Sequence, residues 1–339
     1  MKQAGMTAAG EIEIRDVAPP RAGAGEVLLR VRRIGVCGSD VHVYHGRHPY
    51  TSYPVVQGHE FSGEVAAVGE GVEDIAVGAK VTATPQNTCG RCRQCLRGDY
   101  HICDALAVRG FQAPGCAQEL YVTPAEKILP LPDAFTFEQG ALVEPVAVAV
   151  HAVGRVDAPL AGRNAVVLGA GPIGNLVGQV ARSEGADVLI TDLSEYRLEV
   201  ARKCGLTHTS NAGAEPLAEA ARKAFGPDGF EVAFECAGVE ATITAAVNCI
   251  QKGGTIIVVG VFGEKPRVDL GLVQDRELSL RGTLMYRRAD YRRAIERIAG
   301  RAIATDPLIS KHFPLSEYLS AYRFIDEAGD RTMKVVIDV

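Results

Sequence analysis

Hydrophobic residues in the first 130 positions of the chain fall in short runs of strand length. Residues 26–32, 61–68, 81–84 and 119–122 are rich in apolar and β-branched types, and turns containing glycine or proline bound them. No helical periodicity separates these runs. Strands without intervening helices predict a compact, barrel-like β domain.

From residue 164 onward, apolar runs alternate with helical patterns. We expect strands near residues 166, 188, 208, 232, 257 and 281. Six strands that alternate with helices match the strand count of a doubly wound parallel sheet, so this part predicts a nucleotide-binding architecture. Ser194 is a plausible N-cap for a helix through Lys203, and Gly205 is placed to end it.

Two further stretches complete the predicted organisation. Residues 137–154 have a small-residue helical pattern, and Pro145 within them should start or kink that helix. The tail is expected to form helices over 289–298 and 315–327 and a final strand over 333–337. We therefore predict that the C-terminal residues return to a discontinuous first domain.

A glycine-rich turn follows the first strand of the alternating part. Gly169, Gly171 and Gly174 form G-x-G-x-x-G directly after the strand and open a helix, and the next strand ends at Asp192, 18 residues after the last glycine. The first glycine permits a tight turn, the second lets the backbone approach a pyrophosphate, and the third allows close helix–strand packing. This context predicts dinucleotide binding at a helix N-terminus. The expected contact residues in the turn are Gly169, Gly171, Pro172, Ile173 and Gly174.

Asp192 favours NAD over NADP. A carboxylate at the end of this strand can accept hydrogen bonds from the adenosine ribose hydroxyls and would repel a 2′-phosphate. Arg197, five residues later, could stack on the adenine or pair with a phosphate.

Composition and charge narrow the class of protein. The 339 residues are 47% hydrophobic and carry a net charge of −5 without any block of like charge, so we expect neither nucleic-acid nor membrane-surface binding. No run of eighteen apolar residues predicts a membrane span, and the N-terminus lacks the apolar region of an export signal. Nine cysteines, an odd number, favour metal-bound and free thiols in a reducing cytoplasm over a disulfide framework.

Four of the cysteines are clustered. Cys89, Cys92, Cys95 and Cys103 form C-x2-C-x2-C-x7-C, and short loops can bring four thiolates into a closed tetrahedral zinc site. The bacterial iron–sulfur pattern needs a shorter last gap and a following proline, whereas Asp104 follows here. The sequence therefore predicts a structural zinc, which carries no information about catalysis.

A second metal site is dispersed over two glycine-flanked loops. Cys37, His59 and Glu60 offer a thiolate, an imidazole and a carboxylate. A catalytic zinc keeps three protein ligands and an open position, and this donor set would leave its net charge near zero. Taken alone, the cysteine could be a buried apolar residue and the histidine a core residue; together they favour a metal site.

These residues carry a resemblance that runs from end to end of the chain. The chain resembles the zinc-dependent medium-chain dehydrogenase/reductase superfamily, specifically its polyol (sorbitol, or L-iditol 2-) dehydrogenase branch. The matching motifs are Cys37-Gly38-Ser39-Asp40, Gly58-His59-Glu60, the four-cysteine lobe, Glu144-Pro145 and the glycine-rich turn.

The resemblance implies an α/β protein of two domains. A GroES-like β-barrel catalytic domain would comprise residues 1–143 and 286–339, with the structural zinc lobe at 89–103. A Rossmann doubly wound parallel sheet would comprise 144–285 and bind NAD. The family also implies two zinc ions per chain and a homotetramer, with a homodimer as the alternative.

The same resemblance implies roles for individual residues. Similar enzymes hold an active-site zinc on the residues that match Cys37, His59 and Glu60, with Glu144 near enough to bind water, substrate or the metal in turn. Ser39 would accept the proton of the substrate hydroxyl, and His42 would pass it through the cofactor ribose to solvent. Further cofactor contacts are expected at Val259, Gly260 and Leu284.

The expected reaction is the transfer of a hydride from a secondary alcohol to NAD⁺. Glu60 and Glu144 would accept hydrogen bonds from a vicinal diol, so a neutral or amine-bearing polyol or cyclitol is expected ahead of threonine. Val43 and Met285 depart from the sorbitol-type pattern, which commonly has a tyrosine and an arginine there. An L-threonine 3-dehydrogenase-like activity, a sugar-acid substrate and a zinc-less binding role remain the alternatives, although the intact metal motifs argue against the last.

Overall fold

The computed structural model describes all 339 residues, and the chain divides into two compact units. Unit 1 consists of Met1–Glu144, Arg287–Ala299 and Ile309–Val339, and unit 2 of Pro145–Tyr286 and Gly300–Leu308. The first unit is therefore discontinuous, with its C-terminal segments added after most of the second. None of the helices combines the length and the apolar character needed to cross a lipid bilayer.

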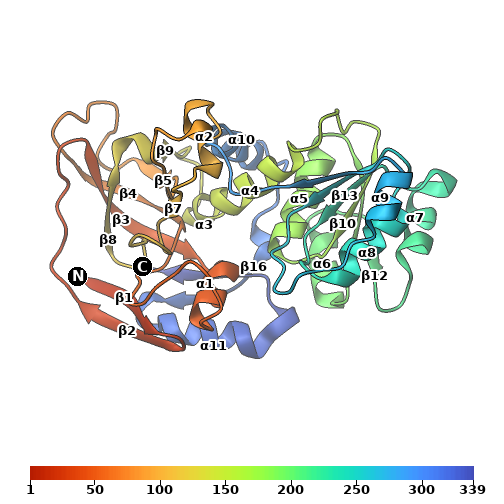
Figure 1. Ribbon diagram of the computed structural model, residues 1–339. Coiled ribbons are helices and arrows are strands. Elements are labelled where there is room, and N and C mark those ends of the chain that lie inside the picture. Colours follow the sequence, from red (N-terminus) through yellow and green to blue (C-terminus); the bar gives the residue numbers. More distant parts are fainter. The chain divides into compact units, whose positions relative to one another are not determined.

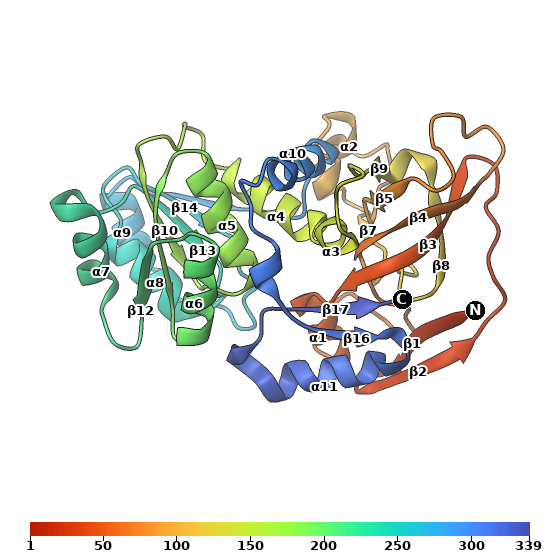
Figure 2. The same ribbon diagram turned by 180° about the vertical axis from the view of Figure 1, so that it is seen from behind.

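Unit 1 is built on a seven-stranded sheet (Figures 1 and 2). Its strands run in the order β16-β17-β3-β4-β5-β9, and β8 pairs with β3 outside this path. The strand bounds are β3 Glu26–Gly35, β4 Glu60–Val68, β5 Lys80–Ala83, β8 Leu120–Pro124, β9 Ile128–Pro130, β16 Ile309–Pro314 and β17 Lys334–Asp338. Two small sheets accompany it, formed by β1 Lys2–Ala8 with β2 Glu11–Asp16 and by β6 Gln86–Asn87 with β7 Ala107–Val108.

The register at the centre of this sheet matters for the site. β3 pairs antiparallel with both β4 and β17, so that Gly35 lies opposite Glu60 on one side and Val336 on the other. The last residues of β3, the first residues of β4 and the C-terminal strand therefore meet at one place in the sheet.

Unit 1 also contains helices, some of which pack against its strands. They are α1 Gly38–Tyr44, α2 Arg93–Leu96, α3 Phe137–Ala141, α10 Arg288–Ala299 and α11 Tyr318–Ala328. The stretch predicted as one helix is broken: α3 ends before Leu142, and α4 Val143–Val153 follows. Pro145 occupies the third position of α4, in the first turn, where a missing N–H costs little.

Unit 2 contains a six-stranded sheet in the order β12-β11-β10-β13-β14-β15, with every neighbouring pair parallel. The six predicted strands are present as β10 Asn164–Leu168, β11 Asp187–Asp192, β12 His208–Asn211, β13 Val232–Glu235, β14 Thr255–Val258 and β15 Ser279–Gly282. The order reverses at β10, which pairs with both β11 and β13. A doubly wound sheet binds its ligand beyond the carboxyl ends of the strands at such a point.

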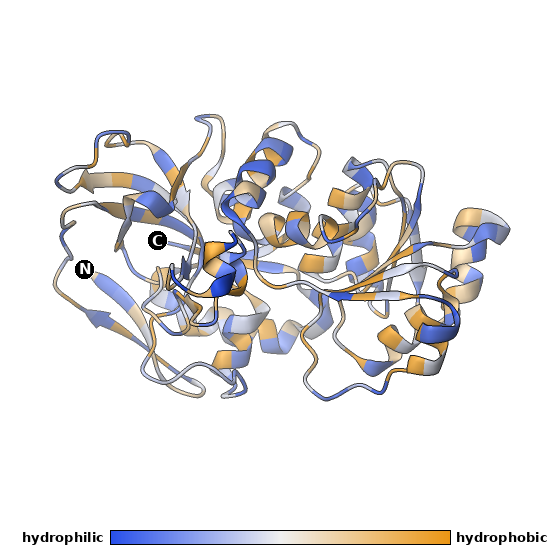
Figure 3. Cartoon of the chain, turned by 45° about the horizontal axis from the view of Figure 1, so that its top comes forward, coloured by the Kyte–Doolittle hydropathy of each residue, from blue (hydrophilic) through white to orange (hydrophobic).

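Helices cover both faces of this sheet (Figures 1 and 2). They are α5 Pro172–Ser183, α6 Glu195–Lys203, α7 Leu217–Phe225, α8 Glu240–Cys249 and α9 Leu270–Asp275. One core cluster joins Val166 and Ala233 of the strands to Ala221 of α7 and Ile243 of α8. The helices accordingly alternate apolar and polar residues along their length (Figure 3).

Several local predictions are confirmed and several elements were missed. Ser194 caps α6, its side chain accepting from the backbone N–H of Arg197, and Gly205 has the positive φ of 84° expected after a helix end. The pattern did not indicate β1, β2, β16 or α7. β16 is the edge strand and spells Ile-Ser-Lys-His-Phe-Pro, whose polar middle hides the strand period.

Candidate metal centre and dinucleotide site

The three dispersed candidate ligands come together in unit 1. Cys37 follows the last residue of β3 by two positions and caps α1, while His59 and Glu60 lie at the start of β4. Because these ends are neighbours in the antiparallel pair, one ligand atom from each residue lies within 4.8 Å of the others. His59 and Glu60 are buried, and Cys37 is half-buried.

The two oxygens of the Glu60 carboxylate lie in different environments. Oε1 accepts a hydrogen bond from Nζ of Lys334 at 2.8 Å, whereas Oε2 is buried and has no hydrogen-bond partner. A Cβ added to Gly35 would lie 2.3 Å from Oε2, so only glycine leaves room for the carboxylate here. Burial lowers the pKa of Lys334, but the charges of Glu60, Cys37 and Glu144 outweigh it, and the net pKa is raised.

Asp40 supports the imidazole from behind, and the sequence analysis did not identify it. It is 1% exposed, accepts the backbone N–H of Cys37 at 3.0 Å, and has its Oδ1 3.5 Å from Nδ1 of His59. Carboxylates in this position orient metal-bound histidines and make them more basic. Gln57 reaches the same aspartate through its side-chain amide, and Tyr322 donates to Gln57 at 2.7 Å. An aspartate three residues after a candidate ligand cysteine was the available signal.

The geometry at these three residues fits a zinc ion. A buried carboxylate oxygen without a partner is costly unless a cation or proton meets it. Here it lies beside a thiol and an imidazole whose far nitrogen faces a carboxylate, a donor set typical of catalytic zinc with an open position.

The predicted proton-relay residues lie on the helix that begins at this centre. Ser39 and His42 are three positions apart on α1 and therefore share a side of the helix. Ser39 is half-buried and His42 is exposed, an order that suits passage of a proton outward. Glu144 is 5% exposed at the end of unit 1, and its charge acts on Lys334.

The two histidines of the loop after α1 differ in exposure. His45 is exposed and pairs with Asp326 at 3.0 Å. His48 is half-buried, because its ring stacks on Phe111 with centroids 4.8 Å apart, and Phe111 also contacts the ring of His59. The phenylalanine thus shields one side of the candidate ligand.

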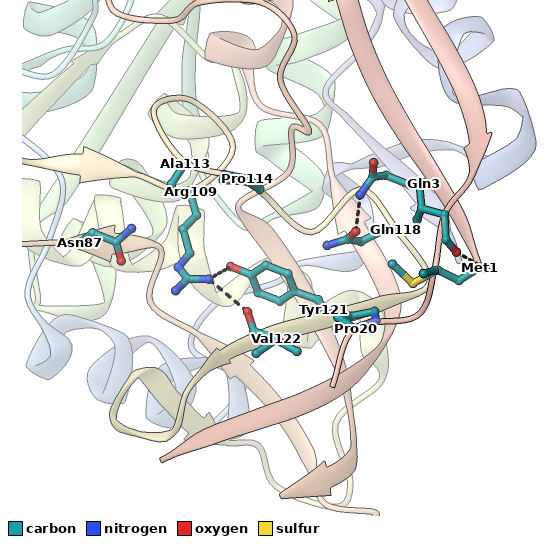
Figure 4. A pocket seen from close by; sticks show the side chains of 12 residues that line it. Met1, Gln3, Pro20, Asn87, Arg109, Ala113, Pro114, Gln118, Tyr121 and Val122 are labelled. Carbon is teal, nitrogen blue, oxygen red and sulfur yellow. Dashed lines mark hydrogen bonds between the residues drawn. The ribbon is translucent and has the colours of Figure 1, made fainter. Parts of the chain in front are cut away.

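Arg109 lies in another part of unit 1 (Figure 4). Its guanidinium donates to the Tyr121 hydroxyl at 3.0 Å and to the Val122 carbonyl at 3.1 Å. It lines a surface hollow of about 460 Å³ together with Asn87 and Gln118. Neither Cys37 nor His59 lines that hollow, so Arg109 has no place in the metal centre.

The four clustered cysteines form a closed site. The Sγ atoms of Cys89, Cys92, Cys95 and Cys103 lie within 4.8 Å of one another. Backbone N–H groups point at the sulfurs, as from Cys92 to Cys89 at 3.3 Å and from Cys95 to Cys92 at 3.4 Å. Backbone donors of Asp104 and Cys95 lower the pKa of Cys92 to about 6, whereas burial and the neighbouring sulfurs raise the pKa of Cys95 to about 12. The arrangement fits a tetrahedral zinc.

The glycine-rich turn of unit 2 follows β10 and opens α5. Gly169 has a φ of 102°, which a side chain would strain, and Gly171 is the N-cap of α5. A Cβ on Gly174 would lie 1.8 Å from the carbonyl of Gly169, so the helix packs too closely for any other residue. Pro172 begins the helix, and Ile173 follows it, leaving a helix N-terminus suited to a pyrophosphate.

Asp192 ends the neighbouring strand and contacts this turn directly. Its Oδ2 accepts the backbone N–H of Ala170 at 2.6 Å, and its Oδ1 accepts that of Ser194 at 2.9 Å. Arg197 places a guanidinium nitrogen 4.0 Å from Oδ2, and its Nε is buried without a partner. Both residues predicted for adenosine recognition therefore lie at the same turn.

The remaining predicted cofactor residues lie after other strands of unit 2. Val259 and Gly260 follow β14, and both donate their backbone N–H groups to the carbonyl of Glu235 at 2.8 Å. Leu284 follows β15 and is 53% exposed. Glu235, which the sequence analysis missed, is fully buried and its side chain accepts the N–H of Gly238 at 2.8 Å, so it fixes the loops at the carboxyl end of the sheet.

Comparison with known proteins agrees with both units. Residues 23–133 match the family model of the alcohol dehydrogenase GroES-like domain, and residues 172–300 match that of zinc-binding dehydrogenase. This chain belongs to the zinc-dependent medium-chain dehydrogenase family. Its fold is accordingly of the α/β class, a GroES-like domain combined with a Rossmann-type parallel sheet, as predicted. The dehydrogenase class is likewise confirmed.

Several relatives of this dehydrogenase match nearly the whole chain. The 2-dehydro-3-deoxy-L-galactonate 5-dehydrogenase of Pseudoalteromonas atlantica is 38% identical over 96% of this chain and 94% of its own, and the D-xylulose reductase of Saccharomyces cerevisiae is 34% identical over 97% and 95%. An L-threonine 3-dehydrogenase of Legionella pneumophila is 31% identical over 96% of each chain. A solved zinc-binding dehydrogenase from Sinorhizobium meliloti 1021, bound to NADP, superposes with a TM-score of 0.93 at 33% identity, covering 100% of this chain and 99% of that one.

Proposed function

We propose that this protein is a zinc- and NAD⁺-dependent dehydrogenase that oxidises a secondary alcohol of a polyol, cyclitol or sugar derivative to a ketone. The observation that carries the proposal is the buried Oε2 of Glu60, which lacks a partner beside Cys37 and His59. When bound, zinc would lower the pKa of a coordinated hydroxyl, and the dinucleotide would accept the hydride.

The residues around the metal centre have separate tasks in this proposal. Cys37, His59 and Glu60 hold the metal, and Ser39 accepts the proton of the substrate hydroxyl. His42 is exposed on the same side of α1 and passes that proton to solvent. Phe111 covers the ring of His59 and keeps water from that side.

The substrate class follows from the acceptors in this part of the chain. Glu60 and Glu144 are buried carboxylates that can accept hydrogen bonds from substrate hydroxyls. A substrate with several hydroxyls supplies several donors to such acceptors, whereas a simple apolar alcohol supplies one. The names of the sugar-acid and ketose relatives support this class, and a sugar acid is included in it.

NAD is proposed as the cofactor on the strength of Asp192. Its carboxylate is 11% exposed and ends β11, where it can accept from ribose hydroxyls and repel a 2′-phosphate. Arg197 is proposed to stack on the adenine. The NADP in the solved relative makes this cofactor choice a point for direct measurement.

The wider assignments complete the proposal. Residues 1–143 and 286–339 serve as the catalytic domain, and residues 144–285 bind the dinucleotide. Each chain would hold two zinc ions, one catalytic and one in the lobe at 89–103. The nine unpaired thiols support residence in the reducing cytoplasm, and family analogy supports a homotetramer.

The deciding experiment is absorbance at 340 nm with NAD⁺ and a panel of alcohols. The panel contains sorbitol, xylitol, myo-inositol, L-idonate, L-threonine and 2-butanol, and kcat/KM is compared across it. The proposal expects kcat/KM to be higher for sorbitol, xylitol, myo-inositol and L-idonate than for 2-butanol and L-threonine. The second candidate is L-threonine 3-dehydrogenase activity, which the threonine dehydrogenase relatives favour. It replaces the proposal if kcat/KM for threonine exceeds that for every other compound by tenfold or more.

A further inference from the structure

The buried ion pair between Lys334 and Glu60 joins the C-terminal strand to the candidate metal centre. The side chains are 4% and 1% exposed, and Nζ lies 2.8 Å from Oε1. Lys334 also donates to the carbonyl of Val36 at 3.2 Å, one residue before the candidate ligand Cys37. A lysine in the apolar run Met-Lys-Val-Val-Ile is otherwise out of place in a central strand, since β17 lies between β16 and β3.

We propose that Lys334 is a positioning residue whose ammonium pairs with the Glu60 carboxylate and so competes with the metal for its negative charge. Lys334 thereby weakens zinc binding and keeps the site folded when zinc is absent. This inference rests on the catalytic zinc site proposed above. The contacts of the lysine are the Glu60 carboxylate and the Val36 carbonyl, so it acts on the metal through the carboxylate.

The electrostatic argument has two parts. A buried carboxylate without a counter-ion is strongly unfavourable, and in the absence of metal the ammonium of Lys334 supplies that counter-ion for Glu60. Once a divalent cation enters, the ammonium remains on one carboxylate oxygen and repels the incoming charge at short range in a poorly screened interior. Lys334 therefore stabilises the metal-free site and opposes the metal-bound one.

The sterics make the competition specific to this carboxylate. Gly35 and Lys334 hold Glu60 from two sides, because any side chain at residue 35 would collide with Oε2. The carboxylate is thus fixed in one place, with one oxygen on the ammonium and the other without a partner. A zinc that shares its carboxylate with a lysine remains electron-poor, and this suits a Lewis acid that must polarise a hydroxyl.

The test compares zinc affinity in the purified protein and in Lys334→Met, which removes the charge and retains most of the side-chain volume. Zinc is titrated against a chelating dye too weak to strip the four-cysteine lobe, and total zinc is counted by atomic absorption. The expected result is zinc binding at least tenfold tighter in Lys334→Met. Its metal-free form should melt at a lower temperature, and added zinc should raise its Tm more than it raises that of the parent.

Three variants serve as controls. Lys334→Arg retains the charge and should bind zinc like the parent protein. Lys80→Met removes a lysine of β5 in the same unit that donates to the carbonyls of Asp133 and Phe135, and it should leave zinc affinity unchanged. In a Glu60→Gln background, Lys334→Met should tighten zinc binding less than it does in the parent, because only the direct repulsion between the ammonium and the metal is then removed.

The outcomes separate this inference from the proposal beneath it. Unchanged or weaker zinc binding in Lys334→Met overturns the inference, because a lysine that merely supports the fold would weaken the site when removed. Should Lys334→Met fail to fold, Lys334→Gln, neutral but able to donate, is held to the same criterion. Absence of an exchangeable zinc in the parent protein would instead overturn the catalytic zinc site itself.

Discussion

The backbone N–H of Ala170 donates to Oδ2 of Asp192 at 2.6 Å, so the acid that ends β11 also holds the glycine-rich turn that follows β10. The other oxygen accepts from the backbone of Ser194, the N-cap of α6. One carboxylate therefore fixes the two backbone segments between which an adenosine ribose would bind. Its charge and its ability to accept hydrogen bonds can be tested separately by substitution.

Asp192→Asn should raise KM for NAD⁺ by about ten- to a hundredfold, because a hydrogen bond to a charged group contributes roughly 1.5–3 kcal/mol. The asparagine retains one acceptor for the turn, so the change reports mainly on the lost charge. KM for NADP⁺ should change much less or fall. The measurement is initial rate at 340 nm with each cofactor at a fixed concentration of alcohol.

Asp192→Ala removes the acceptor as well, and it should have the larger effect on NAD⁺. It is also expected to lower Tm, since the N–H of Ala170 then loses its partner. Equal use of NAD⁺ and NADP⁺ by the unsubstituted protein would contradict the proposed role of this aspartate.

The two zinc sites should respond differently to metal removal. We expect about two zinc ions per chain in the freshly purified protein, the first to leave being that of the open Cys37, His59 and Glu60 site. A strong chelator should therefore abolish turnover while circular dichroism shows that the fold survives. Inductively coupled plasma mass spectrometry gives the zinc count at each stage.

Substitution in the closed lobe should affect folding, because structural zinc contributes folding free energy directly. Cys92→Ser should lower the yield of folded protein or its assembly. Cys249→Ser is a matched control, since Cys249 is half-buried at the end of α8 and belongs to neither site. Finding one zinc ion or none per chain in active protein would contradict the assignment of two zinc sites.

Asp40→Asn should weaken zinc binding at the open site by about 10–100-fold, the usual cost of losing a carboxylate behind a metal-bound histidine. Asparagine has nearly the same shape, so the loss reports on orientation and basicity of His59. Asp326→Asn is the matched control: it removes another aspartate–histidine pair, the exposed contact with His45, and should leave zinc affinity unchanged. Equal effects of the two substitutions would show that Asp40 has no special part in the site.

Those parts of the fold that depend on local periodicity could be predicted from the sequence. The six strands of unit 2 and the cap at Ser194 follow from runs of apolar residues and from single residues with a strong positional preference. Polar or edge strands such as β2 and β16 could not, because their alternation is weak and their place depends on partners distant in the sequence.

The candidate site shows the same division. The cysteine spacing and the motifs around Cys37 and His59 were visible because they are contiguous. Lys334 lies 274 residues from Glu60, and only the pairing of β17 with β3 brings it there. A residue that acts on a metal-ligating side chain from a distant strand has no local sequence pattern by which it could be recognised.

The pH dependence of stability should have opposite signs in the metal-free and zinc-loaded protein. Burial opposes a charge on His59, but Asp40 and then Cys37 favour it, so that without metal its pKa is raised well above 6.5. A raised folded-state pKa contributes stability that is complete below about pH 6.5 and is lost as pH rises through the folded-state pKa. Zinc requires the neutral imidazole, so zinc-derived stability is instead lost as pH falls through the same range.

The quantity to measure is the Tm of the parent protein minus the Tm of Asp40→Asn in the same state, from pH 6 to pH 9. This difference should fall with pH when the open-site zinc has been stripped, and it should rise with pH when the zinc is bound. The comparison with Asp40→Asn removes the contributions of the titrating groups on which the Asp40 charge does not act. In the stripped state, a Tm difference between the two proteins that stays constant across this range would mean that Asp40 does not favour the imidazolium form of His59.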